Sequence, residues 1–172
     1  FAQGCPSDPE AQIYRNNAAV LKAYLAEGTN LTTASAEQLK TLKNNVLIIA
    51  VVVPLRGEAT GTAQEILRGV VAAQQRHNAQ NTNYKIVLQI ANDDTPEDLN
   101  IPDQAATVAK VLVKDPDVFA VVGNYSSGAT AQAASIYTQA NVVAISPSST
   151  AIRTSSTENE ALKTQAIDLN DN

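Results

Sequence analysis

The sequence predicts an α/β fold of three layers, in which a doubly wound parallel sheet lies between two layers of helices. Four short apolar runs rich in β-branched residues alternate with segments whose apolar residues recur at helical spacing. The hydrophobic fraction is 44% but the aromatic fraction only 4%, so the apolar residues are mostly Ala, Val, Ile and Leu. This composition suits strands that are buried on both faces beneath alanine-rich helices. Right-handed crossovers between such strands give a parallel sheet.

The chain divides into three segments. Residues 1–45 are expected to form a helical appendage and a connector, and residues 46–150 an α/β lobe. Residues 151–172 form a polar tail that we expect to be partly disordered. With 172 residues, the chain is long enough to bury one sizeable core.

The first segment contains two helix signals. Ser7-Asp8-Pro9-Glu10 has the form of a helix start with Ser7 as the N-cap, and this helix is expected to run to about Glu27. Gly28 then ends it. A second, short helix is expected over residues 35–42.

The strongest strand signal is the unbroken, β-branched run 46–53, which we expect in the centre of the sheet and which ends at Pro54. The second strand, residues 84–90, contains Lys and Gln and is expected nearer to an edge. The other expected elements are helices over residues 62–77, from Pro102 to residue 113 and around residues 130–140, and strands over residues 118–123 and 142–145.

Hydroxyl-rich loops follow the last two strands, and we predict a ligand site between them. In an open parallel sheet the carboxyl ends of the strands lie along one edge, so both loops face the same crevice. The first loop also opens a helix, whose unpaired N–H groups and dipole favour a carboxylate or another anion. The candidate residues are Tyr125, Ser126 and Ser127 in the first loop and Ser148, Ser149 and Thr150 in the second.

The alternative for these serines is structural, because most serines at such positions cap a helix or shape a turn. Both interpretations stay open at this point. The ring of Tyr125 either covers a ligand or packs on the edge of the crevice.

Charge and motifs argue against several classes of function. A net charge of -5 and a pI near 4.8, without a basic cluster, argue against a nucleic-acid partner. Cys5 is the only cysteine and His77 the only histidine, so a clustered Cys/His metal site is not available. The loop after the first strand has neither G-x-G-x-x-G nor a Walker lysine, so no nucleotide cofactor is expected. No catalytic site is predicted, because His77 lies at a predicted helix end, away from the crevice.

An acidic loop after the second strand suggests an alternative. Asp93 and Asp94 could act in an enzyme or a phospho-acceptor domain of flavodoxin-like architecture, but a receiver domain would need its acidic pair at the end of the first strand. The spacing is also not that of a calcium loop. We therefore expect a solvated acidic loop and no metal site.

Several motifs within residues 46–150 follow one another in an order and spacing typical of one family. They are Val46 to Val53 with Pro54-Leu55, Gln64 to Val70, Asn92-Asp93-Asp94, Val121-Val122-Gly123 with Ser126-Ser127, and Ile145 to Thr150. With these motifs the sequence resembles the type I periplasmic solute-binding proteins. Within that family it is most similar to the branched-chain amino-acid-binding group and to the related extracytoplasmic sensor domains.

The resemblance implies a two-lobed domain that closes on a small ligand, each lobe having a flavodoxin-like sheet of order 2-1-3-4-5. Here the first four strands are recognisable, so the expected order is 2-1-3-4 with the fifth strand missing. The resemblance also implies that Ser127, Ser148 and Thr150 hold the α-carboxylate and α-amino group of an amino acid. Leu55 and Arg56 would line the side-chain end of the pocket. That loop lacks the aromatic residue frequent in the family, so the identity of the ligand stays open.

The resemblance predicts a binding module rather than an enzyme, and no cofactor. We expect the first-lobe fragment of a periplasmic or otherwise extracytoplasmic protein, truncated or cut by proteolysis, whose second lobe completes the cleft. The expected partners are a small polar solute such as an amino acid, and a membrane permease or a receptor signalling domain. A membrane tether through the parent protein and a homodimer through the helices of this lobe stay open. The alternative is a flavodoxin-like regulatory or dimerisation domain without its own ligand.

Overall fold

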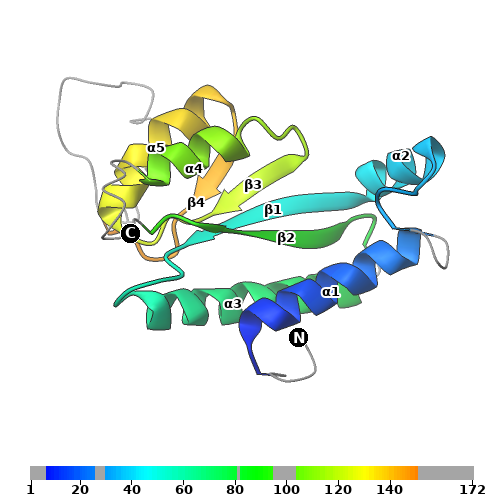
Figure 1. Ribbon diagram of the computed structural model, residues 1–172, viewed down its shortest axis with the longest axis horizontal. Helices are drawn as coiled ribbons and strands as arrows, with labels where there is room; N and C mark the ends of the chain where they lie inside the picture. The colour runs from blue at the N-terminus through cyan, green and yellow to red at the C-terminus, as the bar shows by residue number, and fades with distance from the viewer. Residues whose placement is uncertain (1–6, 26–29, 81, 95–103, 151–172) are drawn as a thin grey trace, which may run out of the picture.

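The computed structural model describes residues 7–25, 30–80, 82–94 and 104–150 (Figure 1). The predictions for Cys5, for the helix start at Pro102 and for residues 151–172 lie outside the described residues. Among the helices of the described ranges, none has both the length and the apolar character that crossing a membrane requires.

Four parallel strands form one sheet in the described part of the chain, in the order β2-β1-β3-β4. The strands are β1 (Val46–Val53), β2 (Lys85–Asn92), β3 (Val118–Val122) and β4 (Val143–Ile145). The predicted order is thus confirmed, with β1 inside the sheet and β2 at an edge. β2 runs two residues further than predicted, because Ala91 and Asn92 still pair with Val52 and Val53 of β1.

Helices cover both faces of the sheet. In Figure 1, α1 (Pro9–Tyr24) and α3 (Thr60–Ala79) lie on one side, and α4 (Gln104–Leu112) and α5 (Ser127–Gln139) on the other. α2 (Ala36–Asn45) leads directly into the start of β1. The three-layer, doubly wound fold predicted from the sequence is therefore confirmed.

Two apolar clusters join the sheet to its helix layers. Val52 of β1 packs with Leu112 and Tyr137 on the α4/α5 face, whereas Val51 packs with Leu67 on the α1/α3 face. Successive side chains of a strand point to opposite faces, so a strand buried on both sides must be apolar at every position. This explains the unbroken run of apolar residues in β1.

α1 packs within one of these clusters. Ile13 is fully buried there, so the helix that the sequence assigns to an appendage contributes to the same core as β1. Its start differs from the prediction, because Asp8 and not Ser7 is the N-cap. Asp8 Oδ1 accepts a hydrogen bond from the backbone N–H of Ala11 at 3.0 Å. Pro9, which follows the cap, takes the first helical position, where its missing N–H costs nothing.

Side-chain amides cover the outer edge of β2. Asn17 of α1 accepts from the backbone N–H of Leu88 at 3.0 Å and donates to its carbonyl at 2.7 Å. Asn78 of α3 does the same for Ile86, at 2.8 Å and 2.9 Å. The buried Gln74 joins the two pairs, because its amide donates to Asn17 Oδ1 at 2.8 Å and to the Ile86 carbonyl at 3.1 Å. Each asparagine thus supplies the donor and the acceptor that a neighbouring strand would offer.

Candidate ligand site

The first hydroxyl loop forms the N-terminus of α5. Ser126 is the N-cap, and its Oγ accepts a hydrogen bond from the backbone N–H of Ala129 at 3.1 Å. Thr130 Oγ1 in turn donates to the Ser126 carbonyl at 2.8 Å. Ser126 therefore has the structural role that the sequence left open. The capped end still carries the positive pole of the helix dipole, which favours a nearby anion.

The second hydroxyl loop contacts the first. Ser149 Oγ donates to Ser127 Oγ at 3.3 Å, and Ser148 Oγ donates to the backbone carbonyl of Tyr125 at 2.7 Å. Ser127 and Ser149 are half-buried, whereas Ser148 is exposed. The structure thus brings four of the predicted residues together in two pairs, at the edge where the strands end. Their role in binding a ligand stays a prediction.

The other three predicted residues lie on the same edge but outside these two hydrogen-bonded pairs. Leu55 is half-buried and packs against the α1/α3 cluster, and its backbone N–H donates to Asn92 Oδ1 at 2.9 Å. Arg56 and Thr150 are exposed. Asn92 therefore ties the loop after β1 to the end of β2, a role that its position after an apolar strand did not indicate.

Gly123 makes the close approach of the first hydroxyl loop to β1 possible. It has φ of +139°, and a Cβ there would lie 2.3 Å from the carbonyl oxygen of Val52 in β1. Its backbone N–H donates to the carbonyl of Ile145 at 2.9 Å, which joins the end of β3 to the end of β4. A side chain at this position would push the first hydroxyl loop away from β1.

Three further residues connect these loops, and sequence reasoning missed their role in the site. Ser146 Oγ donates to the backbone carbonyl of Asn124 at 2.7 Å and accepts from the backbone N–H of Ser149 at 2.9 Å. The side chain of Asn124 is buried and donates to Asp93 Oδ2 at 2.8 Å. The only signal in the sequence was that each residue follows the end of a strand.

The expectation of a solvated acidic loop is wrong for Asp93, which is buried. Desolvation raises the pKa of its carboxyl group above the ordinary value, the hydrogen bond from Asn124 opposes the rise, and the neighbouring Asp94 adds to it. The described ranges contain no group of three or more His, Cys, Asp or Glu side chains that could hold a metal ion.

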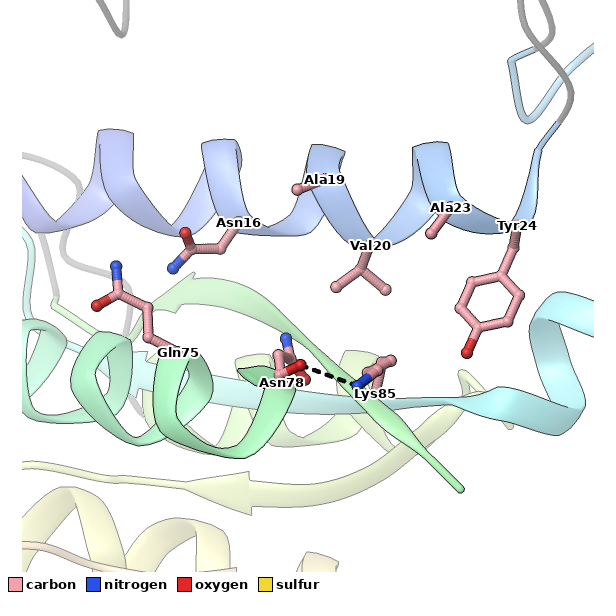
Figure 2. Close-up of a pocket in the computed structure, with 8 residues that line it drawn as sticks. All are labelled: Asn16, Ala19, Val20, Ala23, Tyr24, Gln75, Asn78 and Lys85. Atoms are coloured by element: carbon pink, nitrogen blue, oxygen red, sulfur yellow. Dashed lines mark hydrogen bonds between the residues drawn. The ribbon is translucent and has the colours of Figure 1, made fainter. Parts of the chain in front are cut away.

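Two cavities lie away from the hydroxyl loops. One, of about 360 Å³, lies between α1, α3 and β2 and is lined by Val20, Asn78 and Lys85 among others (Figure 2). Figure 2 shows that Lys85 points toward the end of α3, where its Nζ donates to the Asn78 and Gln80 carbonyls at 2.8 Å each. The other, of about 430 Å³, lies at the amino ends of β1 and β3. No predicted ligand-binding residue lines either one.

Known proteins similar to this chain bind small solutes. A family model described as periplasmic binding protein matches residues 47–164. An amino acid binding protein of Pseudomonas aeruginosa is 31% identical over 121 residues, which cover 70% of this chain and 31% of that protein. A Leu/Ile/Val-binding protein homolog of Brucella abortus is 30% identical over 105 residues, which cover 60% of this chain and 27% of that protein. The chain therefore spans less than a third of the length of these relatives.

Solved structures agree with this similarity. A branched-chain amino acid transporter substrate binding protein from Streptococcus pneumoniae, in complex with isoleucine, is 28% identical and matches with a TM-score of 0.54, over 62% of this chain and 30% of that one. A solute binding protein of an ABC transporter from Rhodopseudomonas palustris BisB5, in complex with 3,4-dihydroxy benzoic acid, matches with a TM-score of 0.52 over 60% of this chain and 27% of that one. This second protein is only 23% identical, so its likeness shows the fold alone.

Proposed function

This chain belongs to the periplasmic binding protein family, and on that premise we propose that its lobe carries one half of a binding site for a small solute such as an amino acid. The observation that supports the proposal is the contact between Ser127 and Ser149, which joins the two hydroxyl loops beside the N-terminus of α5. We propose binding of the solute without a chemical reaction, because the family is one of binding proteins.

The proposed roles follow from the chemistry of each group. A carboxylate accepts hydrogen bonds from hydroxyls and is stabilised by the positive end of a helix dipole, so we assign the ligand's α-carboxylate to Ser127 and the start of α5. An ammonium group needs acceptors, which the hydroxyls of Ser148 and Thr150 supply on the facing loop. Leu55 and the stem of Arg56 would contact the ligand side chain at the end of β1.

The proposed site is half of a cleft. The hydroxyls of the second loop are partly exposed, and small-ligand sites bury most of the ligand surface. We infer that a second lobe of the same protein closes over the ligand. Membership of the family implies an extracytoplasmic location, and a permease or a receptor signalling domain is the proposed downstream partner. The relative from Streptococcus pneumoniae is named as a transporter protein, which favours the permease.

Calorimetry on this chain and on the longest form of the protein that contains it tests the proposal. We expect the longer form to bind L-isoleucine and this chain alone to bind it weakly or not at all, because half a cleft leaves much of the ligand in water. L-isoleucinamide is the matched probe, since it differs only in carrying a neutral amide in place of the carboxylate. We expect it to bind at least about tenfold more weakly, the loss of one charged hydrogen-bonded contact.

Ser127→Ala in the longer form should weaken L-isoleucine binding by about tenfold, whereas Thr138→Ala should leave it unchanged. Thr138 is a matched control, because it is an exposed hydroxyl on α5 that bonds only within its own helix, to the Ala134 carbonyl. If neither the longer form nor this chain bound any of the common L-amino acids, the proposed function would be wrong. Equal affinity for L-isoleucine and its amide would contradict the assignment of the carboxylate.

A further inference from the structure

A buried carboxylate lies beneath the hydroxyl loops. Asp93 follows β2, and its carboxylate accepts a hydrogen bond of 2.8 Å from the side-chain amide of Asn124, which follows β3. Both residues are buried, Asn124 almost completely at 1% exposure. A buried carboxylate is costly unless it is hydrogen-bonded, so the contact fixes Asn124 against the end of β2.

From Asn124 a continuous path of hydrogen bonds leads to the candidate ligand site. The backbone carbonyl of Asn124 accepts a hydrogen bond from Ser146 Oγ at 2.7 Å. Ser146 Oγ accepts from the backbone N–H of Ser149 at 2.9 Å, and Ser149 Oγ donates to Ser127 Oγ at 3.3 Å. The path therefore connects the loops after β2, β3 and β4 and ends at the serine assigned to the ligand.

The cluster is not optimised for stability alone. Asn124 Oδ1 and the hydroxyl of Tyr137 are both buried and have no hydrogen-bond partner among the described residues. Each such atom costs about 1–3 kcal/mol of desolvation that apolar side chains of similar shape would avoid. A polar core at the end of the sheet, kept at that cost, points to a role in the site above it.

We propose that Asp93 and Asn124 are positioning residues of the candidate ligand site, and that they hold its two hydroxyl loops in register through the path that ends at Ser127. The consequence for a ligand rests on the proposed function, but the coupling between the loops does not. Neither residue touches the ligand in this arrangement. They act through Ser146 and Ser149.

The path also makes the loops responsive to pH. An ionised Asp93 accepts a charge-assisted hydrogen bond from Asn124, and protonation weakens that bond. Burial raises the pKa of Asp93, and among the described residues the titratable groups that face it are Asp94 from its own loop and Tyr137 from α5. Asp93 consequently titrates at a higher pH than an exposed aspartate, and the geometry of the hydroxyl loops changes with it.

Nuclear magnetic resonance of the 172-residue chain tests the path without any ligand. We expect the backbone amide signals of Ser149 and Ser127 to shift between pH 3 and pH 7 with the same midpoint as the Asp93 carboxyl carbon. Asp93→Asn, which keeps an acceptor oxygen, should retain the loop signals but abolish their shift. Signals that do not move, or that keep moving in Asp93→Asn, would overturn the proposal.

Ser146→Ala interrupts the path at its centre. In that variant the shifts of Ser149 and Ser127 should disappear while Asp93 keeps its titration midpoint. Thr138→Ala, which removes an equivalent hydroxyl outside the path, should leave all three responses in place. Responses at Ser149 and Ser127 that persist in Ser146→Ala would show that the coupling runs elsewhere and would overturn the path.

A second measurement separates this inference from the proposed function. L-isoleucine is titrated into the longest form of the protein and into its Asn124→Ala variant, which we expect to bind about tenfold more weakly with an intact fold by circular dichroism. Absence of binding by the wild-type form would overturn the proposed function. The amide shifts of Ser149 and Ser127 would still show whether the hydrogen-bond path couples the loops. Equal affinity of wild type and variant would overturn the positioning role.

Discussion

The two edges of the sheet are built in opposite ways. The edge formed by β2 is eight residues long, and Asn17 and Asn78 satisfy the outward-facing backbone groups of Leu88 and Ile86. The edge formed by β4 has only three residues, all of them exposed. Val143 and Ile145 there are 60% and 63% exposed.

This difference shows that the described chain covers the β2 edge with its own side chains and leaves the β4 edge uncovered. A long, unpaired strand is a template for another strand, and proteins commonly cover or interrupt it. α1 and α3 cover β2 with amides that supply a donor and an acceptor at once, so no ladder position at Ile86 or Leu88 stays open. At β4 the apolar side chains face solvent, and such a surface favours contact with further protein.

The largest expected effect comes from loosening the helix that covers β2. Ile13→Ala removes a fully buried side chain between α1 and the sheet, and should reduce the free energy of unfolding by about 3 kcal/mol. Urea denaturation measures this change. Tyr14→Ala is the matched control on the exposed side of α1 and should change stability by less than about 0.5 kcal/mol. A similar, small loss for both variants would mean that α1 is not part of the core.

Removing an amide from the β2 edge should have the next largest effect. Asn17→Ala leaves the N–H and carbonyl of Leu88 without their side-chain partner, and we expect a loss of about 2 kcal/mol. Sedimentation velocity should also detect more self-association, because the freed groups can pair with a second chain.

Asn16→Ala is the control for Asn17→Ala at this edge. Asn16 lies beside Asn17 on α1 but donates to the side chain of Gln74 rather than to the strand, at 3.1 Å. We expect a smaller loss of stability, about 1 kcal/mol, and no gain in self-association. Equal self-association in the two variants would contradict the role of Asn17 as a substitute for a strand.

At the β4 edge, substitution should hardly change stability. The double variant Val143→Thr and Ile145→Thr keeps β-branched side chains at exposed positions, so we expect a change of less than about 0.5 kcal/mol. Self-association of the wild-type chain at high concentration should decrease in this variant, as measured by sedimentation. A loss above about 1 kcal/mol would show that these side chains are covered in solution.

The sequence predicted the sheet well, because periodicity and composition report burial. The apolar run 46–53 gave the bounds of β1 and its place inside the sheet, and both are confirmed. The two hydroxyl loops were also expected on one edge, since parallel strands place their carboxyl ends together. Ser127 and Ser149 are in contact there.

What the sequence did not predict depends on polar partners distant along the chain. Asn17 bonds to Leu88 across 71 positions, and Asn124 bonds to Asp93 across 31. A pattern of apolar residues contains no signal for such pairs, because an asparagine on a helix or after a strand is usually solvated. The sequence pattern therefore favours a solvated acidic loop and a helical appendage, and the structure differs at both places. Ser and Asp can both cap a helix, so the sequence pattern does not distinguish Ser7 from Asp8.

The edges also differ at their carboxyl ends, and this leads to the smallest expected effect. β2 ends beside the buried Asp93, whereas β4 ends beside the neutral Ser146. Because the pKa of Asp93 is raised in the folded chain, the folded state binds its proton more tightly than the unfolded state does. This contribution to stability is fully present below the unfolded pKa and is lost as the pH rises through the folded pKa.

Asp93→Asn should therefore lose less stability than the wild type between pH 4 and pH 7, in urea denaturation at both values. Glu58→Gln, at an exposed carboxylate in the loop after β1, is the control for the loss of one charge and should follow the wild-type profile. A wild-type profile that Asp93→Asn leaves unchanged would mean that Asp93 is solvated in the folded chain. The carboxyl ends of β2 and β4 would then not differ in the burial of a charged group.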